Sequence, residues 1–112
     1  MGRVVIVAYQ PKAGKSAELK KLVHTHVPRL KEEGLVTDRK PVILEATNGT
    51  IIEIFEWLSA EAIQQAHQNK VVHQMWAEFD VVCTYVPLNT LSETGNMFAE
   101  FTPVEFPDHE NK

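Results

Sequence analysis

The chain has 112 residues, a formal net charge of −4 at pH 7 and 44% hydrophobic residues, which is the size and composition of one globular domain. Acidic and basic residues are interspersed, so no basic surface that would follow a phosphate backbone is expected, and nucleic acid is excluded as a partner. No apolar run approaches the roughly 20 residues that cross a bilayer, and the single cysteine cannot form an internal disulfide, so we expect a cytoplasmic protein without membrane partners.

The first predicted element is a strand from Arg3 to Gln10. It is apolar at almost every position and rich in β-branched residues, which indicates a central strand buried on both faces. The loop after it contains Gly-Lys-Ser at positions 14 to 16, as a phosphate-binding P-loop does. That motif needs a glycine five residues before Gly14, where Tyr9 stands, so nucleotide binding is excluded.

A helix is expected from Ser16, a favourable cap residue, to about Glu33, with Gly34 ending it. Its apolar face is formed by Leu19, Leu22, Val23, His26 and Leu30. His24 and His26 resemble a metal-binding pair, but residues two apart on a helix diverge by about 200°. We therefore predict no metal site here: His24 faces water, and His26 is either a core histidine or a pocket residue.

Residues 41 to 58 predict a β-hairpin, because Asn-Gly at positions 48 and 49 separates two alternating runs. A two-residue turn there sets Leu44 opposite Glu53 and Val42 opposite Phe55. One face of the hairpin then carries Val42, Leu44, Ala46, Ile51, Glu53, Phe55 and Trp57, and the other carries Ile43, Glu45, Ile52, Ile54 and Glu56. Both faces are largely apolar, so helices must cover one and a partner the other.

Glu53 falls between Ile51 and Phe55 in this register. A desolvated carboxylate in such company is a candidate acid or base. The alternative is that Glu53 meets a lysine or arginine at the margin of the sheet.

The stretch from Ser59 to Phe79 predicts a broken helix that begins at a Ser59 cap. Ile63, Ala66 and His67 share one face, whereas Val72, Met75, Trp76 and Phe79 form a stripe rotated by more than about 100°. The helix is therefore expected to consist of two pieces joined near Asn69 and Lys70.

Residues 80 to 88, DVVCTYVPL, predict the last core strand, in which Cys83 is a buried apolar residue rather than a nucleophile. From Asn89 the pattern weakens, but Phe98, Phe101, Val104 and Phe106 are too apolar for a solvated tail. They are expected to pack on the body or on a partner subunit. One domain is expected over residues 1–106, with a disordered tail at 107–112.

The segment FEWLSAEAIQQAHQNKVVHQMWAEF, residues 55 to 79, resembles the signature of the antibiotic biosynthesis monooxygenase family. The shared features are an aromatic strand end with Trp57, a turn led by Ser59, Glu-Ala-Ile, and two histidines six residues apart, His67 and His73. The resemblance covers roughly residues 4 to 87. It implies an α+β fold, a ferredoxin-like βαββαβ unit with an antiparallel sheet that dimerises into an α+β barrel.

In that family the substrate pocket lies between sheet and helices, and some members oxidise polycyclic phenols with molecular oxygen and no cofactor. A deprotonated, electron-rich substrate can itself reduce oxygen, so the protein supplies a dry aromatic cavity and a base. The resemblance implies His67 as the base, facing the sheet and Trp57, with His73 as a second catalytic candidate. Together with Trp57, the candidate pocket residues are Glu53, His26 and Trp76.

Two other functions compete with this one. A haem-degrading branch of the same superfamily uses an Asn on the first strand and a Trp and His ten residues apart; this chain has no Asn in residues 3–10 and holds His67 and Ala77 at the aligned positions. A non-catalytic small-molecule binding or stress-related module on the same barrel is the main alternative. No tightly bound metal, haem or other cofactor is expected. A homodimer is expected, because the face with Ile43, Ile52 and Ile54 would otherwise be exposed to water.

Overall fold

Two layers, a sheet and a pair of helices, make up the computed structural model, which describes residues 1–105. Phe106 and the expected tail at 107–112 lie outside the described residues. The elements are β1 (Arg3–Pro11), α1 (Ser16–Glu32), β2 (Val42–Glu45), β3 (Ile51–Trp57), α2 (Ala60–Ala66), α3 (Lys70–Val82), β4 (Cys83–Val86), the 3₁₀ turns η1 (Leu88–Thr90) and η2 (Ser92–Gly95), and β5 (Thr102–Pro103). Within these residues no helix is long and apolar enough to cross a membrane.

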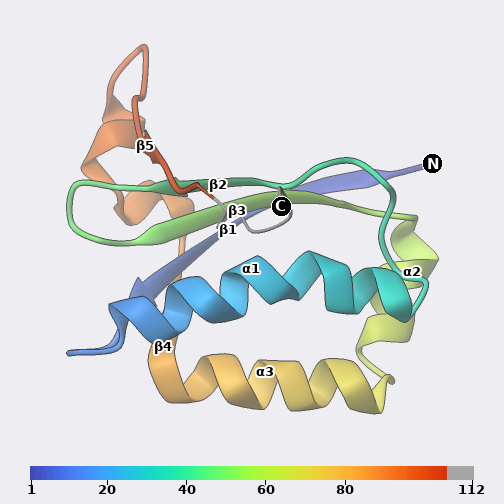
Figure 1. The fold of residues 1–112 in the computed structure, drawn as a ribbon. Coiled ribbons are helices and arrows are strands. Elements are labelled where there is room, and N and C mark those ends of the chain that lie inside the picture. The colour runs from blue at the N-terminus through green and yellow to red at the C-terminus, as the bar shows by residue number, and fades with distance from the viewer. Residues whose placement is uncertain (106–112) are drawn as a thin grey trace, which may run out of the picture.

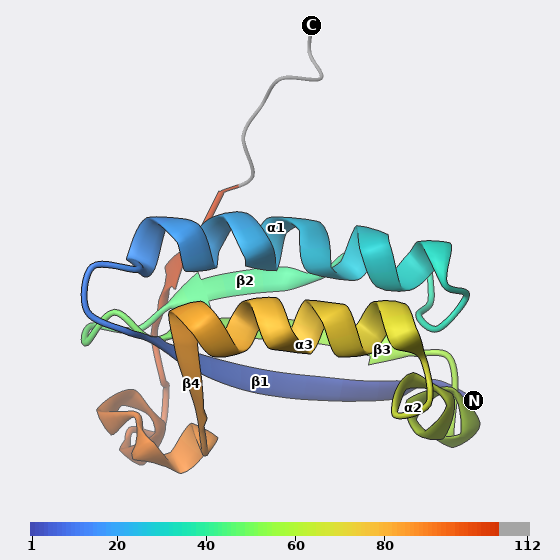
Figure 2. The same ribbon diagram turned by 90° about the horizontal axis from the view of Figure 1, so that it is seen from below.

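The sheet is antiparallel, and over residues 1–105 its strand order is β4-β1-β3-β2-β5. Helices α1 and α3 lie side by side on one face (Figures 1 and 2). The expected α+β class with an antiparallel sheet is confirmed. β1 is central, as predicted, but it is not buried on both faces, since Val4 and Ile6 are 57% and 49% exposed.

The β2–β3 hairpin has a longer turn than predicted, and this shifts its register by one residue. Ala46 N–H donates to the Thr50 carbonyl and Gly49 N–H to the Ala46 carbonyl, each at 2.9 Å, so the loop is Thr47-Asn48-Gly49. Gly49 has a φ of 92°, the left-handed residue that three-residue hairpin loops require. Ile43 therefore pairs with Glu53 and Leu44 with Ile52. A one-residue shift turns every β2 side chain over: Ile43 is buried under the helices, and Val42 lies on the opposite face.

α1 buries Leu19, Val23, His26, Val27 and Leu30, which largely matches the predicted face. The expected cap at Ser16 is wrong: Ser16 is the first helical residue, Lys15 occupies the cap position, and no side chain caps the helix there. Gly34, with a φ of 73°, follows the helix as predicted.

The break between α2 and α3 is confirmed. Ser59 Oγ accepts a hydrogen bond from Ala62 N–H at 3.0 Å, and Asn69 Oδ1 accepts one from Val72 N–H at 3.0 Å, so each helix has its own N-cap. α3 runs on through Val82, so residues 80–82, expected in the last strand, are helical. The buried helix face that contains Met75 and Phe79 continues to Val82, and this packing outweighs the β-branched composition of the segment.

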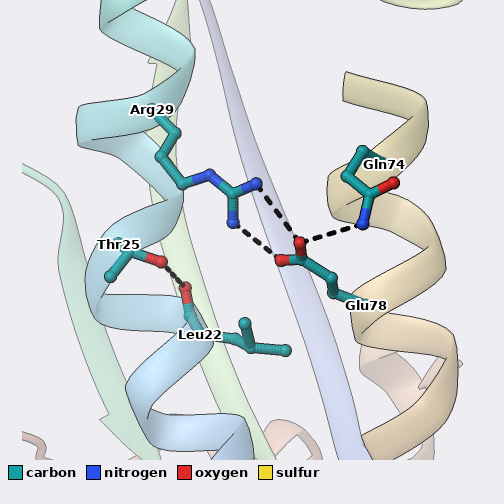
Figure 3. A network of polar contacts seen from close by, with 5 residues as sticks. All are labelled: Leu22, Thr25, Arg29, Gln74 and Glu78. Atoms are coloured by element: carbon teal, nitrogen blue, oxygen red, sulfur yellow. Dashed lines mark hydrogen bonds and ion pairs between the residues drawn. The ribbon is translucent and has the colours of Figure 1, made fainter. Parts of the chain in front are cut away.

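α1 and α3 are joined across their interface by an ion pair (Figure 3). Arg29 Nη1 on α1 donates to Glu78 Oε1 on α3 at 2.7 Å, and Gln74 Nε2 donates to Glu78 Oε2 at 3.3 Å. The hydrogen bond from Arg29 is the largest cause of a lowered pKa at Glu78. The pair helps to hold the two helices in register above the sheet.

The face of the sheet opposite the helices is only partly covered. The segment after β4 crosses it towards the β2 edge (Figures 1 and 2), and Leu91 and Phe101 pack there against Ile52. Phe101 thus packs on the body as expected, whereas Phe98 is 80% exposed. Of the residues predicted to form an open face, Ile43 lies under the helices and Ile52 under Leu91. What stays open is Val4, Ile6 and Val42, here called the open apolar patch.

Candidate functional site

Three polar side chains meet in the layer between the sheet and the helices. Glu53, on β3, is 0% exposed. Its Oε1 accepts a hydrogen bond from the hydroxyl of Tyr9 on β1 at 2.6 Å, and Nδ1 of His26 on α1 lies 2.8 Å from the same oxygen. The other oxygen, Oε2, is buried and has no hydrogen-bond partner among residues 1–105. Glu53 therefore meets a phenol and an imidazole rather than the lysine or arginine that was the alternative.

The donors and acceptors of this cluster follow from its chemistry. The Tyr9 hydroxyl donates to Oε1, and His26 Nδ1 lies within hydrogen-bond distance of the same oxygen, so both neighbours engage Oε1. Burial, and then the charge of Glu53, raises the pKa of Tyr9 well above its usual value. Tyr9 therefore remains a neutral phenol that donates to Glu53.

Aromatic rings surround the carboxylate. Phe79 stacks on Tyr9 with ring centroids 5.0 Å apart, and His26 meets Phe55 and Phe79 edge-on at 5.4 and 5.2 Å. Trp57 packs on Phe55 at 5.3 Å. The polar partners of Glu53 are thus themselves packed among aromatic rings, away from water.

A pocket of about 530 Å³ lies at the margin between α3 and β4 and is lined by Trp76, Ala77, Asp80 and Tyr85. Tyr85 pairs with Tyr9 across the β1–β4 ladder, and their rings touch edge-on at 5.3 Å. Burial raises the pKa of Tyr85 to about 12. Tyr85 lines the pocket, Tyr9 contacts Tyr85, and Tyr9 is bonded to Glu53, so the two tyrosines connect this pocket to Glu53.

A second pocket, also of about 530 Å³, lies between α1 and residues 38–41. His24, Val27 and Pro28 line it from the helix, and Arg39 and Pro41 from the loop. His24 is half-buried there, so the prediction that it faces water is wrong. Burial is the main cause of its lowered pKa, and a hydrogen bond with the backbone of Glu105 opposes that shift.

His67 and His73 lie on the surface, outside the buried cluster. His67 Nδ1 donates to the Ile63 carbonyl at 2.9 Å, and His73 Nε2 donates to the His67 carbonyl at 2.7 Å. Both imidazole rings also pack against Trp76, with ring centroids 5.3 Å (His67) and 5.7 Å (His73) from that of Trp76. The expectation that His67 faces the sheet is wrong: α2 buries Ala62 and Ala66, and His67, its C-cap residue, is exposed. The contacts of both imidazoles satisfy carbonyls at the end of α2, which is a structural role.

The structure thus divides the predicted site residues into two groups. Glu53 and His26 come together in the core, with Trp57 one ring away, and Trp76 lines the α3–β4 pocket. His67 and His73 contact Trp76 from the surface side. Sequence reasoning missed Tyr9 and Tyr85. The signal available for Tyr9 was its position on the same strand face as Val5 and Val7, but only the β1–β3 pairing brings it to Glu53.

Within the part of the chain that the structure describes, no three His, Cys, Asp or Glu side chains gather where they could hold a metal ion. Comparison of the chain with protein-family models, with curated proteins and with solved structures finds no match.

Proposed function

We propose that this protein is a ferredoxin-like subunit of a homodimeric α+β barrel and acts as a cofactor-independent monooxygenase on a small aromatic or polycyclic phenol. The order β4-β1-β3-β2, with α1 and α3 on one face, supports the fold. The observation that carries the function is Glu53 Oε2, a buried carboxylate oxygen with no hydrogen-bond partner in residues 1–105. A buried oxygen of this kind is an available proton acceptor.

The proposed reaction needs only the phenol and molecular oxygen. Glu53 takes the phenol proton, and the phenolate forms a carbon–oxygen bond with O₂ to give a ring peroxide. Loss of the hydrogen on that carbon then breaks the O–O bond, leaving a quinone carbonyl and hydroxide, which the proton from Glu53 converts to water. One oxygen atom thus enters the substrate, the other leaves as water, and the phenol is the electron donor.

Tyr9 and His26 are positioning residues in this scheme. Both hold Oε1, so Oε2 is the oxygen left to meet a substrate. The substrate reaches it from the α3–β4 pocket, past the rings of Tyr85 and Tyr9. His67 and His73 are assigned no proton transfer, because both are exposed on the surface, outside the buried cluster that holds Glu53.

The test begins with a thermal-shift screen of hydroxylated polycyclic aromatics, followed by oxygen uptake with each compound that binds. Glu53→Gln should lower turnover about 100-fold or more, the usual contribution of a general base, and should still bind the compound. Glu56→Gln, on the same strand but the opposite face, is the matched control. Normal turnover by Glu53→Gln, or its loss in His67→Ala alone, would contradict the proposal.

A non-catalytic binding module is the second candidate, and one observation favours it. Tyr9 and Phe79 already fill the space beside Glu53, with ring centroids 5.0 Å apart, and the two surface histidines serve as caps. In that case the same compounds would raise the melting temperature without any oxygen uptake. The two measurements together decide between the candidates.

A further inference from the structure

The α3–β4 pocket sets one carboxylate beside two aromatic rings. It is lined by two aromatic rings, Trp76 and Tyr85, and by the exposed carboxylate of Asp80. No hydrogen bond or ion pair to that carboxylate is found among residues 1–105. Lys12 Nζ donates to the backbone carbonyl of Asp80 at 2.7 Å, so a lysine ammonium lies beside this residue without pairing with its carboxylate. The Asp80 side chain is therefore available to a ligand.

Both rings of the pocket are held in place by their neighbours. Trp76 is in contact with His67 and His73, and Tyr85 with Tyr9. Tyr85 also stays neutral over the physiological range, because burial raises its pKa to about 12. The pocket thus offers two fixed, uncharged π-systems beside one anion, and little ordering of these rings is needed before a ligand binds.

We propose that this pocket binds an organic cation, an alkylammonium or quaternary ammonium group. The faces of indole and phenol rings attract such cations, and a carboxylate within the same pocket adds a full opposite charge. A carboxylic acid or a phenolate would instead be repelled by Asp80. Cation binding itself does not depend on the proposed function. One consequence does rest on it: substrates that pass this pocket on the way to Glu53 would carry a cationic substituent.

The test is isothermal titration calorimetry with tetramethylammonium and choline, at pH 8 and moderate salt. 3,3-Dimethylbutan-1-ol, which has the shape of choline without the charge, should bind at least about tenfold more weakly than choline if the ring faces and Asp80 recognise charge. Asp80→Asn should weaken choline binding by about the same factor, and Trp76→Leu should weaken it further. Asp38→Asn, whose carboxylate pairs with Lys31 elsewhere on the surface, should bind choline as the wild type does.

Equal affinity for choline and its neutral isostere, or unchanged affinity in Asp80→Asn, would overturn the inference, as would the absence of saturable binding by either cation. None of these titrations involves turnover. Failure here combined with loss of oxygen uptake in Glu53→Gln would remove the cation site and leave the proposed reaction. Cation binding without any oxygen uptake would keep the cation site and remove the proposed reaction.

Discussion

The carboxylate of Glu53 is stabilised by a phenol and an imidazole, not by a fixed cation. This matters because a guanidinium partner would hold the carboxylate permanently ionised and occupied, whereas Tyr9 and His26 engage one oxygen and leave the other open. The arrangement keeps a proton acceptor in the core at the cost of one unsatisfied polar atom. Such a cost in a native core is a reason to look for function at that atom.

Both tyrosines of the chain, Tyr9 and Tyr85, are expected to resist ionisation in the folded protein. Burial is the first cause of the raised pKa in each, and the pKa of Tyr85 rises to about 12. Because the folded values exceed the unfolded value of about 10, the stabilisation is complete below that pH and is lost as the pH rises towards 12. Tyrosinate absorbance of the folded and urea-unfolded protein, titrated in parallel, measures this difference.

Tyr9→Phe provides the control for the same titration. It removes one of the two ionisations and should flatten the loss of stability above about pH 10. At neutral pH it should cost about 1–3 kcal/mol, because Glu53 loses a hydrogen-bond donor inside the core. A full tyrosine ionising near pH 10 in the folded wild type would contradict the environment described for these rings.

Two of the three residues of the buried cluster could be predicted from the sequence. Glu53 stood out because a carboxylate between Ile51 and Phe55 must be desolvated, and His26 because it shares a helix face with leucines. Tyr9 could not be assigned, since its partner is 44 residues away and their meeting depends on strand pairing. His67 was misplaced because the buried face of α2 is formed by Ala62 and Ala66, and residue 67 lies about 140° from residue 62 around a helix.

Among the elements, the boundary between α2 and α3 is the one that local sequence patterns predicted best. The change of apolar phase predicted the break, and Asn69 fixes it by capping α3 with Oδ1 while its Nδ2 donates to Glu33 at 3.1 Å. Local sequence patterns predicted the register of the β2–β3 hairpin least well. Asn48-Gly49 correctly marked a turn, but both two-residue and three-residue loops use a glycine with positive φ, and the choice between them decides which face Ile43 occupies.

Asn69→Ala should lower the free energy of unfolding by about 1 kcal/mol, because the first turn of α3 loses its side-chain acceptor. Urea unfolding at neutral pH measures the effect. Asn89→Ala, at an exposed position of η1, is the control and should stay within about 0.5 kcal/mol of the wild type. Equal stability of the two variants would mean that packing alone sets the break between α2 and α3.

At the scale of the whole molecule, the two faces of the sheet are covered to different extents. The helices cover most of one face, while the segment after β4 covers only one end of the other. The open apolar patch of Val4, Ile6 and Val42 remains next to this segment, whose Phe98 is also exposed. Contiguous apolar surface of this kind is what an isologous partner would cover.

We expect the protein to be a homodimer in which the open apolar patch lies at the interface. Ile6→Asp should shift it to monomers in sedimentation equilibrium at micromolar concentration, because the interface would then bury an unpaired carboxylate. The single chain should tolerate the change, since Ile6 is 49% exposed within it. Val71→Asp, at an exposed apolar position on α3, should leave the dimer intact. A folded wild-type monomer at that concentration would exclude the barrel.

The central place of β1 has a consequence for how the chain folds. β1 lies between β3 and β4, so the strand that is made first must wait for partners at residues 51–57 and 83–86 before its ladders can close. Contacts so far apart in sequence form late and slowly, and an apolar strand that waits is the part most open to wrong pairing. A change that delays β3 should therefore stall the assembly of the whole sheet, whereas one in β5, bonded to β2 at the opposite edge, should leave the other strands free to form.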